Sequence, residues 1–122
     1  FMPRIPQIWY LDIFAGKKDY DAADKGGRAG HKEINRTTLN NEYIEHSLKR
    51  EIVLNQLRII RLRNTSKAFS GIIKIKETLD NELDISWTNK QDFAQLKANL
   101  QTLNFTIIYT KSGVNKTMFF QS

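Results

Sequence analysis

The chain has 122 residues, 40% of them hydrophobic and 11% aromatic, which is enough to bury the core of one small globular domain. Its net charge of +6 comes from 19 Lys and Arg against 13 Asp and Glu. Acidic residues interleave with the basic ones nearly everywhere outside residues 58–76, so the sequence does not indicate a basic stripe that would bind nucleic acid. The sequence contains no cysteine and only two histidines, which excludes disulfides and thiolate zinc sites, and we predict neither a metal nor another cofactor.

The first predicted element is the nearly continuous apolar run IPQIWYLDIF, residues 5–14. β-Branched and aromatic residues without polar alternation are typical of a strand buried on both faces. Such a strand needs neighbouring strands, yet residues 15–30 are rich in Gly, Lys and Asp. They indicate a surface loop with at most one helical turn, at residues 20–24. We therefore expect the strand at residues 5–10 to belong to a larger body of protein.

Two helices are expected next. Residues 41–48 place Tyr43, Ile44 and Leu48 at helical spacing, with Thr37 or Thr38 in position to cap the helix. Residues 50–64 form a stronger pattern, whose apolar side chains occupy nearly the whole helical circumference. A helix that is apolar all round is usually covered on more than one side, so we expect this helix to lie between two other bodies of protein.

From Phe69 onward the apolar residues recur with a period of two, which is the period of a β-strand. Alternation begins at Ile73 and continues through four more short segments, separated by turn-forming residues at 80–81, 89–91, 101–102 and 112–113. The pattern predicts an antiparallel meander of five short strands with one face on a core and one in water. Strand spacing assigns the following aromatic side chains to core or interdomain packing rather than to sugar stacking: Trp9, Trp87, Phe105, Tyr109, Phe119 and Phe120.

Three stretches, in order, resemble the C-terminal end of the sucrose phosphorylase group of the α-amylase superfamily, glycoside hydrolase family 13: IPQIWYLDIFAGKKDY, GHKEINRTTL and LKREIVLNQLRIIRLRNTSKAF. In that group a (β/α)8 barrel ends in a strand of the type PGIPQVYY, followed by a loop with an INR element, a last helix ending in an RN pair, and an antiparallel β domain. The resemblance implies an α+β chain. Residues 1–68 would be the last strand and helices of the barrel, and residues 69–122 the C-terminal β domain.

The resemblance further implies a retaining glucosyl phosphorylase as the parent enzyme, which exchanges a glucosyl unit between a sugar acceptor and inorganic phosphate. Such chemistry uses two carboxylates, which in the family come from strands upstream of this region. Asp12 has no second acid positioned with it, so we assign no catalytic residue to this chain and expect it to be inactive alone. The loop GHKEINR differs from the GRDINR of enzymes that act on sucrose, and is closer to sucrose 6′-phosphate or glucosylglycerate phosphorylases.

The same loop supplies the candidate substrate-binding residues. By resemblance, Arg36 matches the arginine that reaches the bound glucosyl unit, and its planar fork suits neighbouring hydroxyls or a carboxylate. His31 and Lys32 are candidates for meeting an anion, either the attacking phosphate or an acidic group of the acceptor, with a solvated loop charge as the alternative. Asn35 either braces the loop or contacts the substrate, and Glu33 either orients Lys32 or Arg36 or touches the substrate.

Two other functions stay open at this point: a non-catalytic β module that binds carbohydrate or a partner protein, and a basic nucleic-acid-binding protein, which the charge pattern disfavours. The expected partners are a glucoside and phosphate in the parent enzyme, and either the upstream barrel portion or a second copy through exposed apolar surface. No apolar window approaches the roughly 18 residues of a membrane span, and residues 1–6 lack the layout of a secretory signal. We therefore expect a cytoplasmic protein that engages no membrane.

Overall fold

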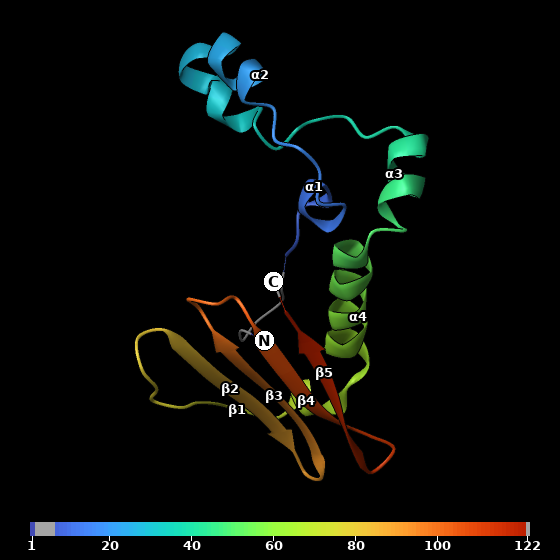
Figure 1. Cartoon of the computed structure of the whole chain (residues 1–122), viewed down its shortest axis with the longest axis vertical. Coiled ribbons are helices and arrows are strands. Elements are labelled where there is room, and N and C mark those ends of the chain that lie inside the picture. The colour runs from blue at the N-terminus through green and yellow to red at the C-terminus, as the bar shows by residue number, and fades with distance from the viewer. Residues whose placement is uncertain (2–6, 122) are drawn as a thin grey trace. The chain divides into compact units, whose positions relative to one another are not determined.

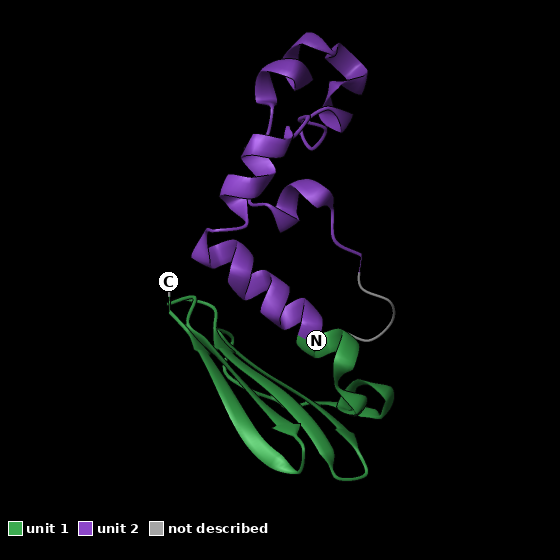
Figure 2. Cartoon of the chain, turned by 90° about the vertical axis from the view of Figure 1, so that its right-hand side faces the viewer, with its two compact units in different colours: residues 1–4, 62–122 green, residues 5–61 purple. Residues whose placement is uncertain are grey.

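The computed structural model describes residues 1 and 7–121, and the chain divides into two compact units (Figure 2). The helical unit is Ile5–Arg61, and the β unit combines Phe1–Arg4 with Leu62–Ser122. The boundary between residues 68 and 69 predicted from the sequence concerns the domains of a parent enzyme, and it stays a prediction.

The helical unit is built from short helices (Figure 1): α1 Tyr10–Ile13, α2 Tyr20–Lys25, the 3-10 helix η1 Gly27–Lys32, α3 Asn41–Ser47 and most of α4 Glu51–Thr65. Two of them begin at a side-chain cap, which supplies an acceptor for an otherwise unpaired N–H group. The Asp19 carboxylate accepts the N–H of Ala22 at 2.9 Å, and the Asn40 side chain accepts the N–H of Tyr43 at 2.8 Å. The predicted helix over 41–48 is confirmed, but its cap is Asn40 rather than Thr37 or Thr38.

The strand predicted at residues 5–14 is wrong in the part that the structure describes. Residues 7–9 lie in no strand and Tyr10 begins α1, whereas Ile5 and Pro6 lie outside the described residues. A strand needs a neighbour to complete its ladder of hydrogen bonds, and within residues 1 and 7–121 the sheet is formed by strands from Ile72 onward. The Trp9 carbonyl instead accepts the N–H groups of Asp12 and Ile13, both at 3.1 Å, so the backbone pairs locally in a helical turn.

Helix α4 confirms the prediction of a helix over 50–64. Its apolar side chains are unevenly covered, because Val53 and Leu62 are buried while Ile52 and Leu54 are 54% and 39% exposed. Within the described part of the chain, α4 therefore keeps an apolar surface open to solvent, and its cover by two other bodies of protein stays a prediction. None of the helices in residues 1 and 7–121 combines the length and the hydropathy needed to cross a membrane.

The β unit contains the predicted five-stranded antiparallel meander, in the order β1-β2-β3-β4-β5 (Figure 1). The strands are β1 Ile72–Ile75, β2 Glu82–Asn89, β3 Asp92–Asn99, β4 Phe105–Lys111 and β5 Val114–Phe120. The last hairpin turns at Ser112 and Gly113, which both have positive φ, 53° and 75°. Two such residues in succession match the right-handed twist of the paired strands.

One face of the sheet forms the core of the β unit. The register places Ile85, Leu96 and Ile107 in one row across β2, β3 and β4, and Ile85 and Ile107 are 2% and 1% exposed. The 3-10 helix η2, Lys67–Ser70, adds the buried ring of Phe69, whose centroid lies 6.0 Å from that of Trp87.

Arg63, in the last turn of α4, places its guanidinium over two aromatic rings of this core. The Arg63 guanidinium carbon lies 4.5 Å from the Phe69 ring centroid and 5.7 Å from the Trp87 ring centroid. A guanidinium over an aromatic face is attracted by the ring quadrupole, and its planar shape packs flat on the ring. The aromatic assignment from the sequence is therefore confirmed for Trp87, which is 7% exposed. Phe119 is 62% exposed, so it does not belong to the core of this unit, and its interdomain packing in the parent enzyme stays a prediction.

The other face of the sheet is more polar, as the alternation predicts, but it is not simply open to water. Asp84, Ser86 and Gln95 are buried on this face. The Gln95 amide donates to Asp84 Oδ1 at 2.6 Å, and Lys76 Nζ lies 3.4 Å from Asp84 Oδ2. Since both carboxylate oxygens have partners, the buried charge is satisfied.

Candidate functional site

Two aromatic side chains hold the INR loop, residues 33–37, from the segment that precedes it in the chain. Trp9 Nε1 donates to the carbonyl oxygen of Asn35 at 2.5 Å, and the Tyr10 hydroxyl donates to that of Thr37 at 2.9 Å. The two rings lie against each other, with centroids 5.6 Å apart. Each ring thus uses its polar tip to fix the loop backbone, while 44% of Trp9 and 39% of Tyr10 stay exposed.

Two further hydrogen bonds tie the same loop to the start of α2. The Thr37 hydroxyl donates to the Lys17 carbonyl at 3.0 Å, and the Asp19 N–H donates to the Ile34 carbonyl at 3.0 Å. All four of these bonds engage a backbone group of the loop or the short Thr37 side chain. They fix the course of the loop without using the Arg36 or Asn35 side chains.

Arg36 pairs with Glu33 inside the loop. Arg36 Nη1 donates to Glu33 Oε1 at 3.0 Å, and the Arg36 N–H donates to the Glu33 carbonyl at 2.9 Å. The two side chains are 58% and 42% exposed. An ion pair this exposed contributes only about 0–1 kcal/mol to stability, so its main effect is to orient the guanidinium. Of the two cationic partners considered for Glu33, the structure selects Arg36.

The other three candidate residues lie close by in the sequence but make no joint cluster with Arg36. His31 and Lys32 are exposed and occupy the last turn of η1. Asn35 is exposed, and it braces the loop through its main-chain oxygen rather than its side chain. Contact of Arg36, Lys32, His31 and Asn35 with a substrate stays a prediction. No group of three or more His, Asp and Glu side chains able to hold a metal ion is found within residues 1 and 7–121.

Arg50 supports the same region from the segment before α4. Its Nη1 donates to the carbonyl of Ala15 at 3.1 Å and to that of Phe14 at 3.5 Å. These carbonyls follow the last turn of α1, where backbone acceptors lack helical partners and the helix dipole favours a cation. Neither this role of Arg50 nor the hydrogen bonds from Trp9 and Tyr10 are predicted from the sequence. The signal in the sequence for the bonds from Trp9 and Tyr10 is that two adjacent aromatic residues with polar tips lie in the middle of an apolar run.

Gly30 lets α2 and η1 approach closely just before the loop. It is buried, and a Cβ placed there would lie 1.7 Å from the Ala23 carbonyl oxygen. Glycine is therefore required because a side chain would not fit at this position, and not because the backbone adopts an unusual φ angle. The position marks where the chain turns from α2 toward the residues that carry the candidate site.

Replacing Gly30 with alanine is expected to destabilise the helical unit by about 1–3 kcal/mol, because the α2 backbone must move away from the added methyl group. Hydrogen exchange of the amides of residues 19–36 measures this loss. Gly27 is the matched control: a Cβ there meets nothing within 4 Å, so Gly27→Ala adds only the strain of its positive φ of 55°. Equal exchange rates in the two variants would contradict the steric account.

The run of helices followed by a five-stranded antiparallel meander matches the C-terminal part of a solved phosphorylase of glycoside hydrolase family 13. Within that class the chain belongs, by homology over about 93% of its length, to the sucrose phosphorylase group. The family resemblance in the sequence is thereby confirmed. No family model matches the chain.

Individual relatives show how much of such an enzyme the chain covers. It is 50% identical over 113 residues to a sucrose 6(F)-phosphate phosphorylase of Ilumatobacter coccineus, and 32% identical over 113 residues to a sucrose phosphorylase of Agrobacterium vitis. These matches cover 93% of the chain and 22% of each relative. The crystal structure of sucrose 6F-phosphate phosphorylase from Thermoanaerobacter thermosaccharolyticum superimposes with a TM-score of 0.84 at 30% identity, over 95% of this chain and 23% of that one.

Proposed function

We propose that the chain is the C-terminal part of a retaining glucosyl phosphorylase and that it supplies Arg36 to the wall of the glucosyl site. The observation that carries this proposal is an exposed guanidinium on a loop whose backbone is fixed by four hydrogen bonds. The names of the relatives support the reaction, since each is a phosphorylase of sucrose or of a phosphorylated sucrose. The acidic groups that cleave the glucoside would come from parts of the enzyme outside these 122 residues.

Arg36 is suited to hold a sugar in place. Its guanidinium presents five N–H donors in a rigid plane, and Glu33 accepts from Nη1. The remaining donors can bridge two adjacent hydroxyls of a glucosyl unit, or meet a carboxylate that flanks it. Because the loop backbone is already fixed, little conformational entropy is lost when the sugar binds.

Lys32 supports an acceptor that carries a negative charge. Its ammonium is exposed at the end of η1, where a compact cation can meet a phosphate oxygen. Two of the three relatives named above act on phosphorylated sucrose, and one of these is 50% identical to this chain. We therefore favour sucrose 6′-phosphate as the substrate of the parent enzyme, with a glucosylglycerate as the alternative.

The apolar residues that the chain leaves open fit contact with the rest of such an enzyme. Ile8, Ile52 and Leu54 are 45%, 54% and 39% exposed. All three belong to the helical unit, and exposed large apolar side chains favour an interface, either with the barrel portion or with a second copy of the chain. Contact with the barrel portion is the partner that the homology supports.

A chimera tests the proposed function directly. In it this chain replaces the matching 22% of the Ilumatobacter coccineus relative. The chimera is expected to release glucose 1-phosphate from sucrose 6′-phosphate and phosphate, and to prefer that substrate to sucrose. The isolated 122-residue chain is expected to release none. Coupled enzymatic detection of glucose 1-phosphate measures both.

The unmodified relative, assayed alongside, sets the level of full activity. A folded chimera without phosphorolysis would reject the proposed function, since the matching region of the relative would then not be replaceable by this chain. Glucose 1-phosphate formed by the isolated chain would show that the missing acids lie within it after all.

A further inference from the structure

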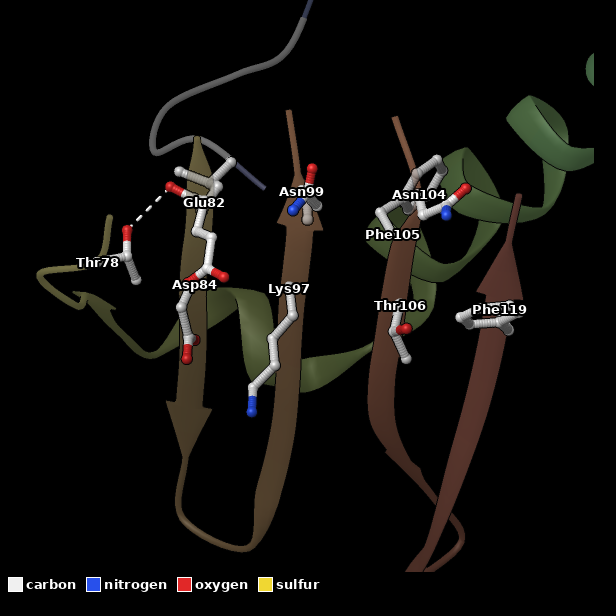
Figure 3. A pocket seen from close by; sticks show the side chains of 11 residues that line it. Thr78, Glu82, Asp84, Lys97, Asn99, Asn104, Phe105, Thr106 and Phe119 are labelled. Atoms are coloured by element: carbon white, nitrogen blue, oxygen red, sulfur yellow. Dashed lines mark hydrogen bonds between the residues drawn. The ribbon is translucent and has the colours of Figure 1, made fainter. Parts of the chain in front are cut away.

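A hollow of about 340 Å³ lies on the polar face of the sheet, opposite the buried row of Ile85 and Ile107 (Figure 3). It runs over the ends of β2, β3, β4 and β5 and belongs entirely to the β unit. The candidate substrate loop lies in the helical unit and contributes no residue to it. The hollow is thus a separate feature that the proposed phosphorolysis leaves unexplained.

Four side chains of different chemistry form a single row across this hollow. The register pairs Asp84 with Lys97, Lys97 with Thr106, and Thr106 with Phe119. The row therefore carries a carboxylate, an ammonium, a hydroxyl and an aromatic ring on four adjacent strands. Three strand spacings correspond to about 14 Å, which offers room for more than one sugar ring.

Phe119 supplies an apolar platform at one end of the row. It is 62% exposed, although its neighbours Met118 and Phe120 on the other face are partly covered. An aromatic ring stacks well on the C–H face of a pyranose, which removes apolar surface of both partners from water. The ring lies beside Thr106, whose hydroxyl is close enough to bind the same ligand (Figure 3).

Hydrogen-bonding groups on the other strands of the hollow remain available to a ligand. Asn99 Oδ1 accepts the N–H groups of Gln101 and Thr102 at 3.0 and 2.9 Å, so the amide of Asn99 can offer its N–H donors. Lys97 is exposed, and among the described residues its ammonium has no ion-pair partner. Glu82, also exposed, lines the same hollow with an acceptor.

The charges of the hollow balance. Asp84 is already paired with Lys76 and Gln95, which leaves the carboxylate of Glu82 and the ammonium of Lys97 as opposite charges on adjacent strands. A phosphate group would gain from Lys97 but be repelled by Glu82. A neutral ligand with many hydroxyls can instead donate to Glu82 and accept from Lys97, Asn99 and Thr106.

We propose that this hollow binds a neutral α-glucosidic oligosaccharide, with Phe119 stacked on one ring and Lys97, Asn99 and Thr106 bound to hydroxyls. The neutral, polyhydroxylated class follows from the hollow itself. The choice of an α-glucosidic sugar rests on the proposed function. Sugar binding to the hollow can be tested in the isolated chain without any enzymatic turnover. Absence of sugar binding would therefore leave the phosphorolysis test unaffected, and absence of phosphorolysis would leave the binding test unaffected.

Titration of the ¹⁵N-labelled 122-residue chain with maltotriose tests the site. Amide shifts are expected to concentrate in β2–β5 around Lys97, Thr106 and Phe119. Phe119→Ala is expected to weaken binding by roughly five- to tenfold, because the stacking surface is lost. Val114→Ala is the matched control, since Val114 is a 56% exposed apolar residue of the same strand that does not line the hollow.

Each alternative result overturns a defined part of the proposal. Absence of localised shifts, or equal affinity of Phe119→Ala and Val114→Ala, would exclude a sugar site built on this ring. Tighter binding of glucose 1-phosphate than of maltotriose would replace the neutral ligand with an anion held by Lys97. Lys97→Met provides a second variant, expected to weaken maltotriose binding about threefold by removing one hydrogen-bond donor. Retained dispersion of the remaining amide signals confirms that either variant is folded.

Discussion

Replacement of Arg36 with alanine in the chimeric phosphorylase is expected to lower kcat/KM for sucrose 6′-phosphate by about 100-fold or more, because a donor positioned on the glucosyl unit is lost. Arg36→Lys should fall between the alanine variant and the unmodified chimera. Lysine keeps the positive charge, but it lacks the planar fork that bridges two oxygens. Initial rates of glucose 1-phosphate formation at varied substrate concentration give both kcat and kcat/KM.

Arg28→Ala is the matched control for this experiment. Arg28 is an exposed arginine of η1 that lies outside the INR loop, and its removal is expected to leave the rate unchanged. Glu33→Gln removes the ion pair but keeps the guanidinium, so its effect should be smaller than that of Arg36→Lys. Since Arg36 is exposed, none of these changes should shift the unfolding temperature appreciably. Unchanged turnover of Arg36→Lys would refute substrate binding by the guanidinium.

The largest effect on stability is expected from Ile85→Ala in the isolated chain. Ile85 is 2% exposed at the centre of β2, in the row that includes Leu96 and Ile107. Removing its side chain deletes buried apolar surface and leaves a cavity, which together cost about 2–5 kcal/mol. That is a large share of the stability of a small domain.

Urea unfolding followed by the fluorescence of Trp87 measures this loss, because Trp87 is buried in the same unit. A Trp9→Phe background removes the signal of the helical unit, which contains the other tryptophan. Ile75→Ala serves as the control: Ile75 pairs with Ile85 from the edge strand, but it is 58% exposed and should change stability by about 0.5 kcal/mol or less. Similar unfolding midpoints for the two variants would contradict the position of the core.

The amino-acid pattern predicted the structure correctly where the structure depends on contacts between residues that are close in the sequence. Alternation with a period of two predicted the β meander, and the turn residues predicted where each strand ends. The apolar spacing after Arg50 predicted α4 within one residue at each end. The helix cap was missed because α3 begins only at Asn41, so that Asn40 occupies the cap position and Thr37 and Thr38 lie before it.

The aromatic side chains of β5 show where alternation fails. Residues Met118, Phe119 and Phe120 are apolar in succession, so the period of two groups Met118 with Phe120 but does not by itself tell which face of the strand meets the core. The register decides it, because Met118 pairs with Ile107 and therefore shares the buried face, which turns Phe119 outward. The segment at residues 5–14 failed for a related reason, since its composition suits a strand but the described chain offers it no partner strand.

The sequence by itself determined helices α3 and α4, the five-stranded meander and the family, since these depend on local spacing and on the residues themselves. Tertiary structure alone decided which groups act on the stretch GHKEINRT: the indole of Trp9, the hydroxyl of Tyr10 and the close approach at Gly30. It also decided that Asp84, Lys97, Thr106 and Phe119 share one row, although 35 residues separate the first from the last. Contacts between residues distant in sequence arise from strand register and helix packing. Neither produces a fixed spacing of residues along the chain from which the contact could be predicted.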